Sequence, residues 1–139
     1  MKEGTLYHVL VKNVPLTRFK RIENRLELGT PDMFFTNMMN RGWLEAKTLI
    51  LPVNSETKVK IPFRPAQLGW IEEEILFGGT CVLGIVTEEG YFFSVNKKIQ
   101  EVYHKYDFEM AMKGDPSPLW FVDDKHLEWF FHNIPFVLE

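Results

Sequence analysis

Three side chains in the first third of the sequence are of the types that hold a hard cation beside a phosphate group. Asp32 ends a Gly-Thr-Pro-Asp turn, and Glu45 and Lys47 follow after twelve intervening residues. Carboxylate oxygens are the ligands that Mg²⁺ or Mn²⁺ prefers over the softer donors of zinc sites. An ammonium group beside the ion can orient its bound water or offset negative charge that develops on a phosphate. These residue types therefore indicate metal-assisted hydrolysis of a phosphate ester.

A β-hairpin is the element that would bring these side chains together. The pattern predicts strands over 32–38 and 42–51, and Gly42 ends the Met-Asn-Arg-Gly connection between them. Alternate residues of a strand point to the same face, so Glu45 and Lys47 should lie side by side. A turn centred near residues 39–40 would place Asp32 roughly opposite Lys47 on that face.

The remaining elements follow from hydrophobic periodicity and from Gly and Pro positions. We expect helices over 2–12, 65–76, 97–106 and 123–132, strands over 16–23, 81–87 and 91–95, a loop over 52–63 and an irregular stretch over 107–120. Asp123 or Asp124 should cap the last helix. The order of elements predicts an α/β fold with a central mixed β-sheet flanked by helices. With 139 residues and no long linker, the chain should form a single domain over 1–139.

Composition excludes several classes of protein without identifying one. The net charge of −3 does not indicate nucleic-acid binding, so any such binding must rest on local basic clusters. Cys81 is the only cysteine, which excludes an internal disulfide and a Cys-rich zinc site. The four histidines lack metal-ligand spacing, and the sequence has no phosphate-binding P-loop. No apolar run approaches the length of a membrane span and no secretory signal is evident, so we expect a cytoplasmic, intracellular protein.

The segment from residue 21 to 86 resembles the PD-(D/E)XK nuclease superfamily, and within it the VRR-NUC branch and related small phage nucleases. The shared features, in order, are Gly29-Thr30-Pro31-Asp32, Trp43-Leu44-Glu45-Ala46-Lys47, Gln67 near the start of a helix, Gly78-Gly79 and the apolar run from Cys81. The resemblance implies a restriction-endonuclease-like core and covers about half of the chain. Residues 107–139 match nothing in the pattern and are treated as a C-terminal extension of unknown role.

The resemblance also implies roles for individual residues. Asp32 and Glu45 would bind Mg²⁺ or Mn²⁺ together with the backbone carbonyl of Ala46, and Lys47 would be the catalytic lysine. Gln67 would face the same site and position Lys47 or a phosphate. The superfamily usually adds an acidic residue before the Pro-Asp pair, for which we select Glu23. Glu3 and Glu27 remain alternatives.

Two basic clusters are candidates for contact with DNA phosphates. Lys58, Lys60 and Arg64 line the predicted loop before the Gln67 helix. Arg21 and Arg25, with Arg18 and Lys20, precede the Pro-Asp motif. Either cluster could equally be ordinary solvated surface.

Together these features predict a divalent-metal-dependent deoxyribonuclease that hydrolyses DNA phosphodiester bonds, of phage or bacterial origin. Branched DNA such as a Holliday junction is a reasonable substrate, because relatives in the superfamily act on it. Symmetric cutting of a junction would need a homodimer. The aromatic C-terminal residues would supply its interface or cap the core: Trp120, Phe121, Trp129, Phe130, Phe131 and Phe136. The alternatives are a non-catalytic nucleic-acid- or protein-binding module on the same fold, and a nuclease that acts on RNA.

Overall fold

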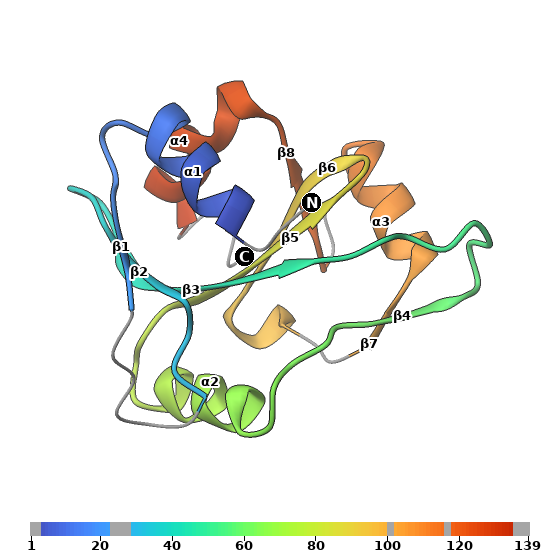
Figure 1. Cartoon of the computed structure of the whole chain (residues 1–139), viewed down its shortest axis with the longest axis horizontal. Helices are drawn as coiled ribbons and strands as arrows, with labels where there is room; N and C mark the ends of the chain where they lie inside the picture. The colour runs from blue at the N-terminus through green and yellow to red at the C-terminus, as the bar shows by residue number, and fades with distance from the viewer. Residues whose placement is uncertain (1–3, 23–28, 100–101, 116–117, 135–139) are drawn as a thin grey trace.

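A mixed β-sheet with helices on both faces forms the centre of the molecule (Figure 1). The computed structural model describes residues 4–22, 29–99, 102–115 and 118–134. The elements in chain order are α1 Gly4–Asn13, β1 Arg18–Arg21, β2 Met33–Thr36, β3 Arg41–Thr48, β4 Lys58–Lys60, α2 Gln67–Leu76, β5 Cys81–Thr87, β6 Gly90–Val95, a 3₁₀ turn Asn96–Lys98, β7 Val102–His104, α3 Lys105–Met112, β8 Trp120–Val122, a second 3₁₀ turn Asp124–His126 and α4 Leu127–His132.

The main sheet has the strand order β1-β2-β3-β5-β6-β8, and β4 pairs with β7 in a separate two-stranded ribbon. Neighbouring strands are antiparallel except β3 and β5, which are parallel. A parallel pair needs a crossover connection, and the segment with β4 and α2 provides it. All seven residues of β5 are buried, as expected for a central strand covered on both faces.

Two hydrophobic cores lie on opposite faces of the sheet. One core packs α1 and α4 against the sheet through residues such as Leu6, Leu44 and Phe131. The other packs α3 and the β4–β7 ribbon against it through residues such as Phe92 and Phe108. Figure 1 places α1 and α4 together on one side of the sheet and α2 on the other. Side chains on alternate positions of β3 therefore enter two different environments.

The segment 97–112 differs from the prediction. We expected a helix over 97–106 and irregular chain over 107–120, but the chain forms the strand β7 before α3 begins at Lys105. The Asp107 carboxylate accepts a hydrogen bond from the His104 backbone N–H (2.8 Å), which starts the helix after the strand. The predicted loop over 52–63 contains β4, which pairs with β7. These short strands were missed because each is defined by pairing with a segment more than forty residues away.

The segment from Trp120 to His132 packs onto the main sheet. The strand β8 pairs with β6, and α4 packs into the first core. The 3₁₀ turn before α4 is capped as predicted, because the Asp123 carboxylate accepts a hydrogen bond from the His126 N–H (3.0 Å). No helix among the described residues has both the length and the apolar character required to cross a bilayer.

Candidate active site

Glu45 and Lys47 lie on one face of β3, as the alternation predicted. The Lys47 Nζ atom is 3.2 Å from the Glu45 Oε2 atom, and both residues are almost completely buried (3% and 2% exposed). A buried ion pair is stabilising only when further polar contacts replace the lost hydration. The surroundings of this pair therefore decide whether it is a structural or a chemical feature.

Gln67 supplies one of these contacts from the start of α2. Its Oε1 atom accepts hydrogen bonds from Lys47 Nζ (3.0 Å) and from the Arg64 backbone N–H (2.7 Å). Gln67 is fully buried, whereas a residue in the first turn of a surface helix is ordinarily solvated. The structure thus brings Gln67 to Lys47, as the resemblance in motif order implied.

Asp32 reaches the same site from the chain just before β2. Its Oδ2 atom accepts a hydrogen bond from the Ala46 backbone N–H (3.1 Å). The register of β2 and β3 pairs Met33 with Leu44, so continuing it puts Asp32 level with Glu45. We expected Asp32 opposite Lys47, two residues further on. The turn is centred one residue earlier than predicted, because the Asn37 side chain closes it.

The position of Asp32 depends on close contact between two backbone segments. Gly29 has a φ of +87°, and a side-chain carbon at this position would overlap the carbonyl group of Ala66. Glycine is the residue that tolerates both conditions. This contact brings the turn before Asp32 against the residue that precedes α2. The Gly29 of the motif therefore helps to position Asp32 and Gln67 in one site.

The carboxyl group of Glu45 is electrostatically perturbed. Burial, followed by the charge of Asp32, raises its pKa from 4.5 to about 7, although the neighbouring Lys47 acts in the opposite direction. A buried carboxyl group whose pKa is raised by burial and by a neighbouring carboxylate is typical of a site that takes up a cation. Near neutral pH, Glu45 would exchange its proton for such an ion.

Two polar atoms in this cluster are buried without a hydrogen-bond partner among the described residues. They are Glu45 Oε1 and Gln67 Nε2. An unpaired buried carboxylate oxygen is costly, and a metal ion is one group that would satisfy it. Asp32, Glu45 and the Ala46 carbonyl would provide only oxygen ligands to a metal ion, and oxygen ligands suit Mg²⁺ or Mn²⁺. Among the described residues, no group of three or more Asp, Glu, His or Cys side chains is placed to hold a metal ion, so at this site they supply two carboxylates.

One contact with Lys47 was not predicted. The Phe63 ring centroid lies 5.9 Å from Lys47 Nζ, within the range of a cation–π interaction. Phe63 stands between two prolines just before α2. The sequence feature that could have predicted this contact is an aromatic residue between Pro62 and Pro65, because the two prolines restrict the backbone next to the site.

The predicted basic residues fall in different places. Lys58, Lys60 and Arg64 are exposed on β4 and on the connection to α2. Arg21 lies with its guanidinium 5.0 Å from the ring centroid of Tyr7 in α1, on the face opposite Glu45. Glu23, Arg25 and the alternatives Glu3 and Glu27 lie outside the described residues.

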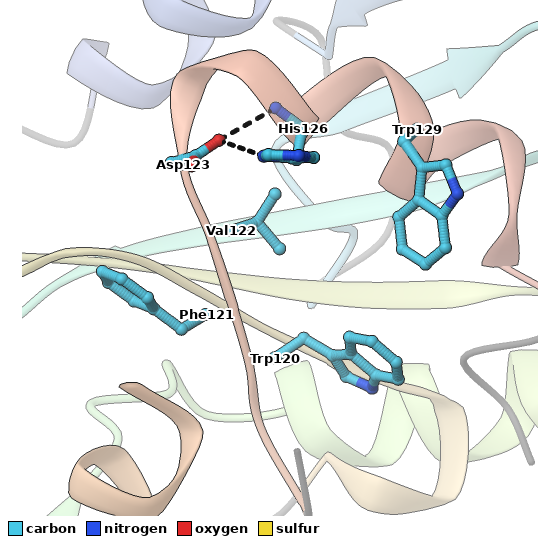
Figure 2. A pocket seen from close by; sticks show the side chains of 6 residues that line it. All are labelled: Trp120, Phe121, Val122, Asp123, His126 and Trp129. Carbon is cyan, nitrogen blue, oxygen red and sulfur yellow. Dashed lines mark hydrogen bonds and ion pairs between the residues drawn. The ribbon is translucent and has the colours of Figure 1, made fainter. Parts of the chain in front are cut away.

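The aromatic residues of the C-terminal segment mainly complete the fold. Phe130 and Phe131 are fully buried in the first core, and Phe136 lies outside the described residues. Trp120 and Trp129 instead border a hollow of about 320 Å³ beside β8 and α4 (Figure 2). Trp129 is 47% exposed there. This hollow lies at the edge of the sheet furthest from β1, away from Glu45 and Lys47.

Comparison with known proteins shows the fold. No protein-family model matches the sequence, and no curated protein matches it. Among solved structures, the chain resembles that of Archaeoglobus fulgidus Hjc, a Holliday junction resolvase from an archaeal hyperthermophile, with a TM-score of 0.50 and 13% sequence identity. The match covers 73% of this chain and 80% of that chain. The protein therefore has a mixed-sheet, restriction-endonuclease-like fold, as predicted from the sequence.

Proposed function

We propose that this protein is a divalent-metal-dependent nuclease that hydrolyses phosphodiester bonds of DNA, with branched DNA as its preferred substrate. The observation that carries the proposal is the buried cluster of Glu45, Lys47 and Gln67 beside Asp32, in which one Glu45 oxygen has no hydrogen-bond partner within the described ranges. The similarity in fold to a Holliday junction resolvase supports the nuclease class and the choice of branched DNA. The motif order favours the VRR-NUC and small phage nuclease branch of the PD-(D/E)XK superfamily.

In this proposal Asp32, Glu45 and the Ala46 carbonyl hold Mg²⁺ or Mn²⁺, and Glu23 is the third carboxylate. When bound, the ion lowers the pKa of a coordinated water and neutralises charge on the phosphate. Glu45 must lose its proton before it can serve as a ligand, and its raised pKa makes this step sensitive to pH near 7.

Lys47 is the catalytic residue of the proposal. In hydrolysis a water oxygen bonds to phosphorus, the bond to one sugar oxygen breaks, and that oxygen takes up a proton. The Lys47 ammonium carries donors that stabilise the negative charge growing on the phosphate oxygens. The Gln67 Oε1 atom accepts a hydrogen bond from Nζ at 3.0 Å, and its buried Nε2 group, which has no partner in the described part of the chain, would donate to a phosphate oxygen.

The substrate backbone would lie against Lys58, Lys60 and Arg64, which flank the connection to Gln67. Arg21 and Arg25 remain proposed contacts, although Arg21 lies on the other face of the sheet. We propose that residues 1–139 act as a single nuclease domain with 107–139 as its C-terminal extension. Two copies would combine to cut both strands of a junction, with the hollow at Trp129 as one surface for their contact.

Cleavage assays with Mg²⁺ test the proposal on four matched substrates: a four-way DNA junction, a linear DNA duplex, single-stranded DNA and an RNA duplex. We expect cleavage of the junction, and a loss of at least about 100-fold in Lys47→Ala. Lys113→Ala is the matched control, because Lys113 is an exposed lysine at the end of α3. Equal rates for the parent and Lys47→Ala would contradict the mechanism. Absence of cleavage on every substrate would favour a non-catalytic binding module, and cleavage of RNA alone would change the substrate class.

A further inference from the structure

Two methionines project from the turn between β2 and β3. Met38 is 97% exposed and Met39 is 68% exposed, although both have long apolar side chains. A single exposed apolar residue needs no explanation, but two adjacent ones at the tip of a hairpin form a small exposed apolar patch. Methionine is also polarisable and adapts its shape to aromatic surfaces.

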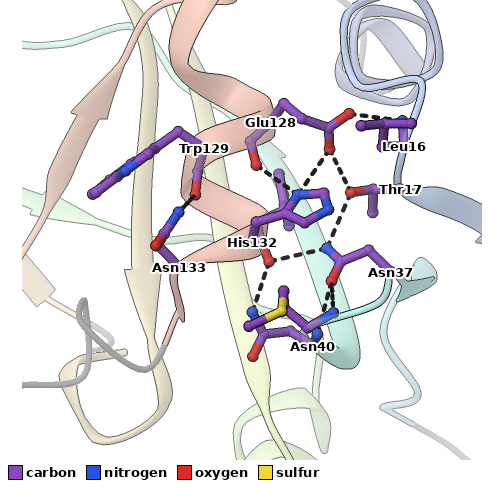
Figure 3. A network of polar contacts seen from close by, with 10 residues as sticks. Leu16, Thr17, Asn37, Asn40, Glu128, Trp129, His132 and Asn133 are labelled. Carbon is purple, nitrogen blue, oxygen red and sulfur yellow. Dashed lines mark hydrogen bonds and ion pairs between the residues drawn. The ribbon is translucent and has the colours of Figure 1, made fainter.

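The hairpin tip is held more rigidly than an ordinary surface turn. The Asn37 Oδ1 atom accepts hydrogen bonds from the backbone N–H groups of Met39 (2.9 Å) and Asn40 (2.7 Å). The side-chain amides of Asn37 and Asn40 both donate to the Phe131 carbonyl at the end of α4, at 3.0 and 2.9 Å. Figure 3 shows these contacts joining the hairpin to the C-terminal helix.

A second group of contacts links the chain before β1 to α4 and to the hairpin turn. Glu128 accepts hydrogen bonds from the Leu16 N–H (2.7 Å) and the Thr17 hydroxyl (2.8 Å), and Asn37 donates to that hydroxyl oxygen (3.1 Å). A turn fixed at several points has lost its conformational entropy in the free protein. It can therefore press its apolar residues against a partner with little further ordering cost.

Positive charge flanks the apolar tip. Arg18 pairs with Thr36 and Thr36 pairs with Arg41, so the three residues form one row across β1, β2 and β3. Both arginines are exposed, and directly paired residues share a face of the sheet. Arg41 also shares the face of Glu45 and Lys47, because all three occupy alternate positions of β3. An anionic partner that touches this row would therefore extend over the same face as the candidate active site.

We propose that Met38 and Met39 form an apolar wedge that presses against unstacked base pairs at a DNA branch point, while Arg18 and Arg41 hold the phosphates on either side. This inference rests on the proposed function and adds the element that selects branched DNA. Proteins that distort DNA commonly insert apolar side chains of this size between base steps. Met39 precedes Glu45 by six residues, which corresponds to about 20 Å along a strand. At about 3.4 Å per base pair, the wedge contacts DNA about six base pairs from the cleaved bond.

The test measures DNA binding separately from cleavage. In the Lys47→Ala background, the affinities for a four-way junction and for a linear duplex are compared by fluorescence anisotropy. 2-Aminopurine placed at the branch point reports unstacking of the bases. We expect the double variant Met38→Ser with Met39→Ser to bind the junction about tenfold more weakly and to lose the fluorescence increase, with duplex affinity nearly unchanged. Arg18→Gln with Arg41→Gln should weaken binding to both DNAs and lower the salt dependence of log Kd by about two.

The matched control replaces Ile50 and Val53 by serine, because these residues are 91% and 95% exposed on a different loop. Their replacement should leave both affinities as they were. The inference is overturned if the methionine variant binds and unstacks the junction like its parent, or if the control loses as much affinity. It is also overturned if the methionine variant changes from dimer to monomer with junction binding intact, since the tip would then contact a second copy. Each of these results is independent of whether Lys47 supports cleavage.

Discussion

Two polar clusters of similar size lie on either side of the β2–β3 hairpin, and they differ in how completely their hydrogen bonds are satisfied. At Glu128, both carboxylate oxygens accept hydrogen bonds from backbone or side-chain donors, and the His132 Nδ1 atom lies 3.1 Å from Glu128 Oε2. At Glu45, one oxygen contacts Lys47 and the other has no partner among the described residues. The protein's own donors satisfy the first cluster, whereas the second leaves a buried carboxylate oxygen without a hydrogen-bond partner among the described residues.

This difference explains why burial alone does not identify a functional site. Glu45 is the more buried of the two carboxylates and has a pKa raised to about 7. Such a group lowers the stability of the empty protein, and natural sequences retain costs of this kind where binding or catalysis requires them. The Glu128 cluster serves the same hairpin by holding it in place. In the proposed function, one side of the hairpin supplies the chemistry, and the other side holds the hairpin in place.

Replacing each glutamate by glutamine gives the sharpest separation between the two clusters. Glu45→Gln keeps the shape of the side chain but removes the charge, and we expect cleavage to fall at least about 100-fold. Glu128→Gln should cleave at nearly the parental rate at a temperature where it is folded. Rates measured with saturating Mg²⁺ on one junction substrate check both. Comparable losses in the two variants would show that the two clusters do not differ in their role in cleavage.

The stability of the metal-free protein should depend on pH through Glu45. Its pKa is raised on folding, so the native state holds an extra proton between about pH 4.5 and 7. The contribution of Glu45 to the free energy of unfolding is therefore fully present below pH 4.5. This contribution is lost as the pH rises through 7, which lowers the stability by at most about 3 kcal/mol. Urea unfolding at pH 5, 6, 7 and 8 measures this decline. Glu45→Gln should flatten the decline, and Glu128→Gln should retain it.

The Glu128 cluster makes its contribution to stability in a different way. Glu128→Ala removes the acceptor for the Leu16 N–H and for the buried Thr17 hydroxyl. We expect the free energy of unfolding to fall by about 2 kcal/mol, independent of Mn²⁺. Differential scanning calorimetry with and without the ion provides the measurement. A stability loss that Mn²⁺ restores would place this cluster among the metal-dependent features instead.

Phe63 should have the smallest effect. Its ring lies 5.9 Å from Lys47 Nζ, and a contact of this kind contributes about 1 kcal/mol. Phe63→Leu preserves bulk but removes the aromatic face, so kcat should fall about fivefold with little change in KM. Phe77→Leu, at an 80% exposed position, is the control for general effects of the substitution. An unchanged kcat in Phe63→Leu would show that the ring only fills space.

The sequence was most informative where local spacing determines geometry. Alternation on β3 predicted that Glu45 and Lys47 share a face, whereas the place of Gln67 was implied only by the resemblance in motif order. The residue opposite Asp32 differs by two positions from the prediction, because the position of the turn depends on the side chain of Asn37. Neither β7 nor β8 was predicted, since each has three residues and is defined by a distant partner strand. The contacts between α4 and the hairpin join residues more than ninety positions apart, and no local pattern signals them.

Calorimetric titration with Mn²⁺ tests the central claim most directly, because it requires neither a substrate nor a choice of nucleic acid. The parent should bind the ion, with affinity that weakens about tenfold per unit as the pH falls below 7 and Glu45 becomes protonated. Asp32→Asn and Glu45→Gln should abolish the binding heat, while Glu128→Gln retains it. Binding that survives both substitutions at the candidate site, or is absent from the parent at pH 8, would contradict the account.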